Sequence, residues 1–405
     1  MKNSLKLLGI TLVLCIGLGF IACENNANNG GINDGGDPGP FDITAAELVS
    51  RMRVGWNMGN SLDAATGSGS AVHQMEQWWG VPPITRENIR AIREAGFNLI
   101  RIPITWAKAV DPNTFIIRED WMMRVMQIVN WAYEEELFII INTHHDSGDV
   151  GQVIFSLRDD QVEGSLVRFR IIWEQIAATF RYFEERLIFS PLNEPRVVGT
   201  GVTWTGREEY YINLNRHYQL FVDTVRASGA NNRYRFFLFT TYAASRTLQA
   251  MNGLVLPDDP SPLPNRHIVS YHAYVPSGFS FGGAPGSASY NNRTWSPDGR
   301  SGRDALDITE PLDQFYQRFV ANGIPVIIGE FGATDKDNVE ARADMIYFYT
   351  RQARDRGMPV IIWDNHQTWP GPDTNNNERF GLFDRDTNTF FFPEIVDALM
   401  RGSQD

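Results

Sequence analysis

The sequence predicts a domain of the α/β class, folded as a single (β/α)8 TIM barrel with its functional site at the C-terminal ends of the strands. Two features lead to this prediction. Eight apolar runs alternate with longer amphipathic stretches between residues 41 and 405, and their continuous Val, Ile, Leu and Phe content suits strands buried on both faces. An open doubly wound sheet is the alternative. The turn after the first run, at 55–60, lacks the G-x-G-x-x-G spacing that such a sheet would use.

The eight apolar runs predict strands at residues 53–58, 98–104, 138–145, 187–193, 235–242, 267–274, 325–331 and 359–364. Between the first two strands, Thr85 can cap the start of a helix and Gly96 can end it. The next helix shows apolar residues at helical spacing from Trp121 to Ala132. Further helices are predicted within 167–185, 207–228, 309–322 and 337–356. The link 243–266 is the weakest helical stretch, because several prolines interrupt it.

The first 40 residues are not expected to belong to the barrel domain at 41–405. Residues 1–22 carry lysines followed by a nearly continuous apolar stretch, too short to span a membrane comfortably, and predict a signal peptide. The end of this segment resembles a bacterial lipobox with Cys23 as the lipidated residue; a simple secretory signal is the alternative. Residues 23–40 are almost free of apolar side chains and predict a flexible linker. We therefore expect an exported protein, anchored to the cell envelope or surface through a lipid, or otherwise secreted.

Composition narrows the possible partners. The net charge is −12 and no cluster of Lys and Arg occurs, so a nucleic-acid partner is not expected. The chain has two cysteines, and neither lies in 41–405, which excludes a disulfide or a cysteine metal site there. Aromatic residues make up 12% of the chain, which is compatible with a neutral ligand that binds flat against rings. A monomer is expected.

Polar side chains gather where the predicted strands end. The fourth strand, in LIFSPLNEPR (187–196), runs directly into Asn193 and Glu194. Taken alone, this segment would favour a plain turn with a solvated glutamate. Other strands end in the same way, in residues with chemically active side chains: Arg101, His144, His145, Asp146, His272, Tyr274, Glu330 and Trp363. Because the C-terminal ends of barrel strands form one face, we expect these residues to form one site.

A metal centre is one alternative for this site. His144, His145 and Asp146 offer metal ligands, but adjacent residues of a strand point to opposite faces, so the two histidines fit a shared ion poorly. The acidic segment 373–378 could bind calcium, although its spacing is not that of an EF-hand loop and a solvated loop is expected. No metal or cofactor is therefore predicted, and chelator-sensitive activity would restore this alternative.

Two glutamates suit a different chemistry. Glu194 and Glu330 close the fourth and seventh strands, which face each other across the mouth of a barrel. Glycoside hydrolysis needs two carboxyl groups that flank the glycosidic bond, one protonated and one ionised. Arg101 and the Tyr274 hydroxyl could keep Glu330 ionised. His272 lies on the same strand face as Tyr274 and could orient Glu194.

Seven segments, taken together, resemble glycoside hydrolase family 5, and within it subfamily 4 of bacterial endo-β-1,4-glucanases. They are GWNMGNSLDA (55–64), GFNLIRIPITW (96–106), IIINTHHD (139–146), NEPR (193–196), SYHAYVP (270–276), IPVIIGEFGA (324–333) and IIWDN (361–365). The resemblance implies that Glu194 is the acid/base and Glu330 the nucleophile. It also implies a cleavage subsite lined by Arg101, His144, Asn193, His272, Tyr274 and Trp363. Two departures from the family pattern, FSPLNEPR and His366 in place of a frequent glycine, leave the pair of glutamates intact.

The implied activity is that of a retaining endo-β-1,4-glucanase acting by double displacement on cellulose-type glucan, mixed-linkage glucan or xyloglucan. Retention requires carboxyl groups ~5–5.5 Å apart, whereas a gap of ~6.5–9.5 Å would mean inversion. Asn193 would bind the sugar 2-hydroxyl and Trp363 would stack on the sugar ring. The resemblance also implies a cis peptide bond between Trp363 and Asp364, which would aim the indole at the sugar.

Other residues are candidates for further contacts. Asn57 and His145 are each predicted to contact a sugar hydroxyl. Several tryptophans are candidate sugar platforms, each as often core as cleft: Trp56, Trp78, Trp79, Trp106, Trp204, Trp295 and Trp369. The loop 278–303 is expected to influence the choice of substrate. A xylanase, a mannanase or a non-catalytic glycan-binding lipoprotein are the alternative functions.

Overall fold

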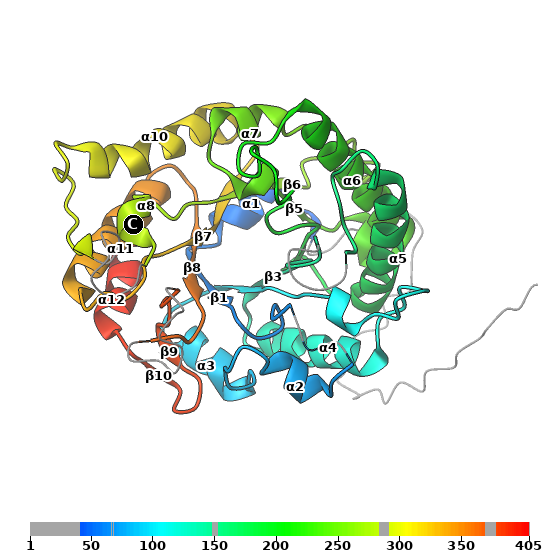
Figure 1. The fold of residues 1–405 in the computed structure, drawn as a ribbon, viewed down its shortest axis with the longest axis horizontal. Helices are drawn as coiled ribbons and strands as arrows, with labels where there is room; N and C mark the ends of the chain where they lie inside the picture. The colour runs from blue at the N-terminus through cyan, green and yellow to red at the C-terminus, as the bar shows by residue number, and fades with distance from the viewer. Residues whose placement is uncertain are drawn as a thin grey trace, which may run out of the picture. The chain divides into compact units, whose positions relative to one another are not determined.

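The computed structural model describes residues 41–404, except 66, 68, 148–152, 283–290 and 369–377. Eight strands form a closed barrel in the order β1 to β8; neighbouring strands are parallel, and β8 pairs with β1. Figure 1 shows the helices as an outer ring around these strands. The predicted (β/α)8 barrel is confirmed. The predictions for the signal peptide, Cys23 and the linker lie outside the described residues.

All eight predicted strands are present. They are β1 (Val54–Met58), β2 (Leu99–Ile102), β3 (Phe138–Asn142), β4 (Leu187–Ser190), β5 (Phe237–Thr240), β6 (His267–His272), β7 (Val326–Phe331) and β8 (Val360–Asp364). The predicted ends of β2 to β6 reached too far toward the C-terminus. The chain leaves the ladder there because backbone groups bond to side chains and loops instead. The backbone N–H of Ile104, for example, donates to the side chain of Asn142 at 3.1 Å.

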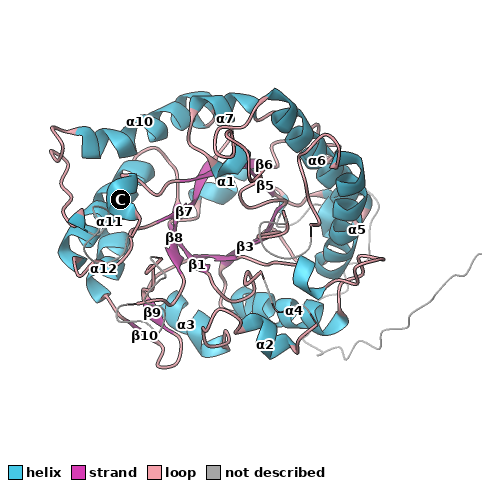
Figure 2. Cartoon of the chain, viewed as in Figure 1, coloured by secondary structure: helices cyan, strands magenta, loops and turns pink. Residues whose placement is uncertain are grey.

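Helices precede β1, occupy every link between the barrel strands and follow β8 (Figure 2). They are α1 (Ala45–Ser50), α2 (Val72–Glu76), α3 (Arg86–Glu94), α4 (Glu119–Glu134), α5 (Val162–Phe180), α6 (Glu208–Ala227), α7 (Leu248–Gly253), α8 (Ser277–Ser280), α10 (Arg303–Arg318), α11 (Val339–Arg354) and α12 (Pro393–Gly402). A short hairpin of β9 (Phe383–Asp384) and β10 (Thr389–Phe390) follows β8. The proline-interrupted link between β5 and β6 holds a 3₁₀ turn (Tyr242–Ala244) and the six-residue α7, so it has little helix, as its sequence suggested.

The helix before β2 illustrates how local sequence sets the boundaries. Thr85 caps α3 through a capping box, in which its hydroxyl accepts from the N–H of Asn88 at 3.1 Å and its own N–H donates to the Asn88 side chain at 2.9 Å. Gly96 follows the helix with φ +106°, a conformation that L side chains rarely adopt. Both predicted ends of this helix are confirmed.

Apolar side chains form two separate clusters, one on each face of the barrel wall. The larger cluster lies between the strands and the surrounding helices. The smaller one fills the barrel interior with the residues Leu99, Ile140, Ile188, Leu238, Ile268, Ile327 and Ile361. Leu48 and Val49 of α1 pack against this inner layer and cover it at the end opposite the mouth. Burial of both faces explains why the strands read as continuous apolar runs.

The inward face of the wall changes from apolar to polar along the strands. Each strand carries another inward-facing residue two positions further along the chain. These residues, mostly polar, are Asn57, Arg101, Asn142, Ser190, Thr240, Ser270, Gly329 and Trp363. Because all the strands are parallel, this polar layer lies at one end of the barrel. The packed layer below it is the floor on which the site is built.

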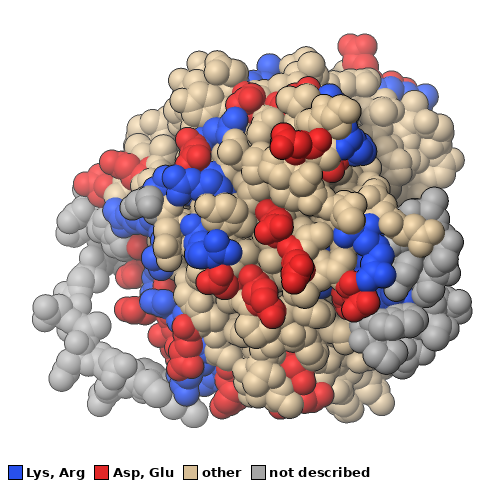
Figure 3. Space-filling model, turned by 90° about the vertical axis from the view of Figure 1, so that its left-hand side faces the viewer, with Lys and Arg blue, Asp and Glu red and all other residues tan. Residues whose placement is uncertain are grey.

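Charged side chains on the outside are mostly paired with neighbours. On the face drawn in Figure 3, Lys and Arg side chains are interspersed with Asp and Glu side chains. Ion pairs such as Arg86–Glu134 and Arg216–Glu163, both 2.6 Å, are exposed and contribute roughly 0–1 kcal/mol each. Across the part of the chain that the structure describes, no helix has the length and apolar character needed to cross a bilayer.

Candidate active site

Glu330 is enclosed at the C-terminal end of β7. Its Oε1 accepts a hydrogen bond from Arg101 Nη1 at 2.8 Å, and its Oε2 accepts one from the Tyr274 hydroxyl at 2.8 Å. The pairing of β7 shifts register around Glu330, and such a bulge re-aims a side chain toward the mouth. The side chain is only 7% exposed. Both predicted contacts of Glu330 are therefore present, and together they fix the orientation of its carboxylate.

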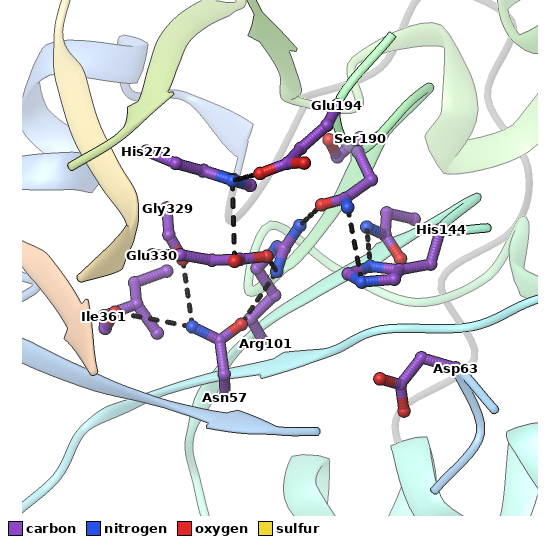
Figure 4. Close-up of polar contacts among 12 residues, drawn as sticks. Asn57, Asp63, Arg101, His144, Ser190, Glu194, His272, Gly329, Glu330 and Ile361 are labelled. Carbon is purple, nitrogen blue, oxygen red and sulfur yellow. Dashed lines mark hydrogen bonds and ion pairs between the residues drawn. The ribbon is translucent and has the colours of Figure 1, made fainter. Parts of the chain in front are cut away.

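Arg101 connects three strand ends through one guanidinium group. Its Nη1 donates to Glu330 and also to the Asn57 side chain at 2.8 Å (Figure 4). Its Nη2 donates to the Asn193 side chain at 2.5 Å. The side chain of Arg101 is 2% exposed. The guanidinium spreads its donors in a plane over two terminal nitrogens, whereas the three donors of a lysine radiate from a single nitrogen.

Asn57 lies beneath Arg101 and not on the cleft surface. It is fully buried, and its Nδ2 donates to the carbonyl of Gly329 at 2.9 Å. Its side-chain oxygen accepts from Arg101. The structure therefore contradicts the predicted contact between Asn57 and a sugar hydroxyl, because the polar atoms of this side chain are turned toward the barrel wall. Asn57 holds Arg101 in place.

Glu194 follows β4 and is more open than Glu330, with its side chain 21% exposed. Its Oε1 accepts from His272 Nδ1 at 2.9 Å, as predicted, and its Oε2 accepts from Arg196 Nη1 at 2.8 Å. Burial alone would raise the pKa of Glu194, but the His272 hydrogen bond and the charges of His272 and Arg196 outweigh it and lower the pKa to about 2. Glu194 is thus ionised when the cleft holds no sugar.

The two carboxylates lie close together. One oxygen of Glu194, one oxygen of Glu330 and a ring nitrogen of His272 all lie within 4.8 Å of one another. His272 Nδ1 is 3.5 Å from Glu330 Oε2, so the same imidazole faces both carboxylates (Figure 4). The pair is therefore arranged to act on one bond from two sides.

A second group of aromatic side chains lines the mouth beyond Arg101. His144 is held between the amides of Asn142 (3.1 Å) and Asn193 (3.2 Å), and it stacks on Trp363 with ring centroids 5.9 Å apart. Desolvation, together with the charges of His145 and Arg101, lowers the pKa of His144 well below its usual value, and desolvation lowers that of His145 to about 4. Both rings are neutral near pH 7, so neither places a charge beside a neutral ligand, and the two ring nitrogens of His144 are already engaged by Asn142 and Asn193.

Trp363 closes β8, half-buried, with its ring over the backbone of Gly59. A Cβ on Gly59 would come within 2.6 Å of the indole, so only glycine allows this close approach. The predicted cis bond between Trp363 and Asp364 is wrong: within the described residues the cis bond is Val275–Pro276. β8 stays paired with β1 through Asp364, which keeps the chain extended without the ~3–4 kcal/mol cost of a non-proline cis bond.

His366 adopts a backbone conformation that explains why a glycine is frequent at this position. Its φ is +61°, in the left-handed region that is costly for most side chains. The imidazole Nδ1 lies 3.0 Å from the carbonyl of Phe383, and this contact helps to hold the loop after β8. The departure from the family pattern is thus accommodated locally.

The predicted placement of His144 and His145 on opposite faces of a strand is wrong. β3 ends at Asn142, so strand alternation does not apply, and the two rings are 4.5 Å apart at 86°. Ligand atoms of both histidines and Asp63 lie within 4.8 Å of one another. The Asp63 oxygens, however, accept the backbone N–H groups of Asn60 (2.9 Å) and Ser61 (2.7 Å). A metal would have to compete with these contacts.

Two further groups of described residues have metal-ligating atoms within the same distance. One is Glu194, His272 and Glu330. The other is His366, Asp384 and Asp386, where Asp384 Oδ1 accepts the N–H of Asp386 at 2.9 Å within a turn. The first group belongs to the carboxylate pair itself. The acidic segment 373–378, for which a solvated loop was expected and calcium was the alternative, lies outside the described residues except for Glu378.

The candidate sugar platforms divide into core and surface. Trp56, Trp106 and Trp295 are buried and pack as core residues. Trp78 is 50% and Trp204 is 60% exposed. Trp79 is half-buried and meets His145 edge to face at 5.6 Å, so it continues the mouth beyond His145. Trp369 lies outside the described residues.

Three residues near the pair were not singled out from the sequence. Arg196 binds Glu194, and Asn142 orients His144. Desolvation and the negative charges of Glu194 and Glu330 raise the pKa of Glu378, so this third carboxyl group lies close to the pair. The position of Arg196 two residues after Glu194 was a usable signal. No sequence pattern placed Glu378 beside the two glutamates, because it lies 14 positions after the end of β8 (378 − 364) and outside the eight strands.

Comparison with known proteins agrees with this geometry. The family model described as cellulase (glycosyl hydrolase family 5) matches residues 63–368. Cellulase/esterase CelE of Acetivibrio thermocellus is 39% identical over 90% of this chain, and endoglucanase A of Clostridium longisporum is 36% identical over 89%. The chain spans 41% of the length of the first relative and 66% of the second.

Solved structures are similar over most of both chains. A subfamily 4 broad-specificity endoglucanase from Clostridium longisporum has a TM-score of 0.80 at 35% identity, covering 89% of this chain and 98% of its own. A lichenase from Caldicellulosiruptor sp. F32, in complex with cellotetraose, has a TM-score of 0.82 at 35% identity, covering 90% and 96%. The chain therefore belongs to glycosyl hydrolase family 5, a family of retaining glycoside hydrolases, and to its subfamily 4, as the seven sequence segments indicated.

Proposed function

We propose that the chain is a retaining endo-β-1,4-glucanase in which Glu330 is the nucleophile and Glu194 the acid/base. The observation that carries this proposal is the close approach of the two carboxylates, with one oxygen of each within 4.8 Å. Inverting enzymes keep their carboxyl groups ~6.5–9.5 Å apart to admit a water molecule, so this shorter separation supports retention.

In the first step, Glu330 attacks the anomeric carbon while Glu194 gives its proton to the glycosidic oxygen. The leaving sugar departs as an alcohol, and a covalent glycosyl-enzyme remains on Glu330. The proton on Glu194 is taken up as substrate enters, because a sugar that displaces water from the cleft disfavours the charged form of the carboxyl group. Tyr274 keeps its proton throughout, since desolvation and the charge of Glu330 raise its pKa well above the usual value.

In the second step, Glu194 is ionised and takes a proton from a water molecule. The resulting hydroxide displaces Glu330 from the anomeric carbon on the face that the leaving sugar vacated, so the configuration is retained. Asn193 supports both steps. Its side-chain oxygen accepts from Arg101 and its Nδ2 contacts His144 Nε2 at 3.2 Å, so the second N–H of the amide is the part left to bind the sugar 2-hydroxyl.

Two observations support the proposed substrate class: the descriptions of similar enzymes and the aromatic side chains at the mouth of the barrel. The Clostridium longisporum enzyme is described as having broad specificity, and the Caldicellulosiruptor enzyme as a lichenase. The neutral aromatic surface formed by Trp363, His144, His145 and Trp79 suits stacked, uncharged sugars. We therefore expect activity on mixed-linkage glucan and soluble cellulose-type glucan, with xyloglucan, xylan and mannan as the substrates to compare.

The test is reducing-sugar release by the purified domain 41–405 on carboxymethylcellulose, barley β-glucan, xyloglucan, xylan and mannan, beside Glu330→Gln. Activity on one or more β-1,4-glucans that falls about 10⁴-fold or more in the variant is expected for loss of a nucleophile. Activity only on xylan or mannan would select the alternative enzyme. Glycan binding without activity in either protein would select the non-catalytic alternative.

We further propose that the chain is exported, held at the cell envelope or surface by a lipid on Cys23, and active as a monomer. The charged and apolar segment 1–22 and the lipobox-like residues before Cys23 support this location. Metabolic labelling with a radioactive fatty acid should label the full chain and not Cys23→Ser. Light scattering of the purified domain should give the mass of one chain.

A further inference from the structure

Arg196 contacts both the catalytic region and an exposed aromatic ring. Its Nη1 donates to the side chain of Glu194 at 2.8 Å and to the backbone carbonyl of Glu194 at 3.1 Å. Its guanidinium carbon lies 4.6 Å from the ring centroid of Trp204. The side chain of Arg196 is 17% exposed, and Trp204 is 60% exposed. One charged group is therefore held between a reacting carboxylate and a surface tryptophan.

The backbone on both sides of Arg196 is fixed by the loop after β5. The carbonyl of Pro195 accepts the N–H of Ala243 at 2.8 Å, and the N–H of Val197 donates to the Tyr242 hydroxyl at 3.0 Å. Tyr242 is itself fully buried. With both flanking peptide units held, the side chain of Arg196 cannot turn away from Glu194 by a movement of its backbone.

Glu194 faces charged or titratable groups from each side of the mouth. His272 donates to it from β6, and Arg196 donates to it from its own loop. Its negatively charged or acidic neighbours are Glu330, Glu378 and the Tyr274 hydroxyl, and His145 adds a neutral ring. Arg196 is the permanently charged group in direct contact with the Glu194 carboxylate.

We propose that Arg196 is a positioning residue that stabilises the ionised form of Glu194, and that Trp204 holds it there on the leaving-group side of the cleft. This inference rests on the proposed function, in which Glu194 is the acid/base. An acid/base lies beside the oxygen of the leaving sugar, so the ring that contacts Arg196 lies on that side. The exposed area of Trp204 then offers the leaving sugar a stacking surface.

The ion pair has a consequence in both chemical steps. As Glu194 gives up its proton, the carboxylate that forms gains the charge interaction with Arg196, so this interaction is stronger in the transition state than in the protonated ground state. In the second step the same ion pair keeps Glu194 ionised, as a base must be. Arg196 thus sets the pH range over which Glu194 can alternate between acid and base.

The experiment compares two aryl β-cellobiosides in Arg196→Gln. Phenyl β-cellobioside needs a proton on its leaving oxygen, whereas 2,4-dinitrophenyl β-cellobioside has a leaving group stable enough to depart without one. Loss of the positive charge should move the basic limb of kcat for the phenyl substrate, which reports the protonation of Glu194 in the enzyme–substrate complex, to higher pH by about one unit. The kcat/KM of the dinitrophenyl substrate near neutral pH should stay within about twofold of wild type, which also shows that the variant is folded.

Three further variants separate charge from structure. Arg196→Lys keeps a positive charge and should keep the basic limb close to that of wild type. Trp204→Ala should move the limb in the same direction as Arg196→Gln but less far. Arg207→Gln removes a charge farther along the same loop, where Arg207 pairs with Glu209 and stacks on Tyr210, and should leave the limb unmoved.

Several results would overturn the inference. An unmoved limb in Arg196→Gln, or an equal loss on both substrates, would reduce Arg196 to a structural role. An unmoved limb in Trp204→Ala would remove Trp204 from the proposal. The Glu330→Gln variant separates the two proposals: if it stays active on both cellobiosides, the proposed function fails, and if it is inactive while Arg196→Gln behaves as wild type, only this inference fails.

Discussion

Two fully buried arginines lie at opposite ends of the barrel and do different work. Arg101, at the mouth, ends on the side chains of Asn57, Asn193 and Glu330. Arg235, just before β5, has its five N–H groups bound to the Asn232 side chain and to four backbone carbonyls. These carbonyls come from the end of α5 and the turn into β4, so Arg235 closes the end of the barrel away from the mouth.

The difference shows that a buried charge marks a functional site through its partners and not through its burial. Arg235 binds only neutral acceptors, and desolvation, with the charge of Arg226, lowers its pKa to about 9. Arg101 binds a carboxylate that faces the cleft. In the sequence the two look alike, since each adjoins an apolar run: LIRI for Arg101 and RFFLFT for Arg235. The contact of Arg101 with Glu330 was predicted from the sequence, whereas the partners of Arg235 are revealed only by the fold.

The largest effect is expected for Arg101→Lys. The three partners of Arg101 are shared between its two terminal nitrogens, and a single ammonium nitrogen does not reproduce this spacing, so Glu330 should lose its fixed orientation. We expect kcat/KM on barley β-glucan to fall about 10³-fold, comparable to the loss of a preorganised donor worth ~4 kcal/mol. The exposed Arg90→Lys, whose partner is Glu135, is the control and should be fully active. Near-normal activity in Arg101→Lys would mean that Arg101 is structural, like Arg235.

Arg235→Met should show the opposite behaviour. It leaves four carbonyls without their donor, and we expect the free energy of unfolding to fall by about 3 kcal/mol, measured by urea denaturation. The kcat of the folded fraction should be unchanged, because none of the partners of Arg235 lies at the mouth. The exposed Arg181→Met, on the surface near the end of α5, should change neither quantity. A large loss of kcat in Arg235→Met would break the comparison.

Tyr274→Phe tests the second donor on Glu330. Removing the hydroxyl leaves the Oε2 of a buried carboxylate without its 2.8 Å hydrogen bond, and a bond to a charged group is worth about 2 kcal/mol. We expect kcat to fall about 30-fold. Tyr133→Phe is a matched control, because Tyr133 donates to Glu184 at 3.0 Å far from the mouth. If both variants keep full activity, the Tyr274 hydroxyl does not support Glu330.

Much of the fold was readable because it depends on local pattern. Continuous apolar runs located the eight strands, and helical periodicity located helices between them. The capping residue Thr85 located the start of one helix. The strand ends were less predictable. The side chain of Asn142, for example, takes the backbone N–H of Ile104 and so ends the ladder early. Such exchanges depend on which side chains meet in space, and the chain order does not state this.

The catalytic pair could also be predicted from the sequence, whereas the residues that contact it could be predicted only in part. Parallel strands bring their ends together, so Glu194 and Glu330 could be paired across 136 positions of sequence. The second layer of contacts could not be read. The convergence of His144 and His145 depends on where β3 stops, and the trans bond after Trp363 depends on β8 pairing with β1. These features are decided by neighbours in the fold.

Asn57→Ala is expected to have the smallest effect, and it tests the corrected role of this residue. Asn57 and Asn232 are alike: each is fully buried, each accepts from a buried arginine (Arg101 at 2.8 Å, Arg235 at 3.1 Å), and each donates to a backbone carbonyl. Loss of one such anchor costs about 1.4 kcal/mol.

For Asn57→Ala this cost should appear as a lower kcat, because Arg101 would lose a contact that fixes it and would then orient Glu330 less well. We expect kcat to fall about tenfold with KM unchanged, since the side chain is closed off from the cleft. Asn232→Ala should lose a similar amount of stability and keep its kcat. A rise in KM for Asn57→Ala at constant kcat would instead return Asn57 to the sugar-binding surface, as the sequence had suggested. If kcat fell equally in Asn57→Ala and Asn232→Ala, or in neither, the contrast between the two ends of the barrel would be wrong. The partners of a buried arginine would then not decide its role.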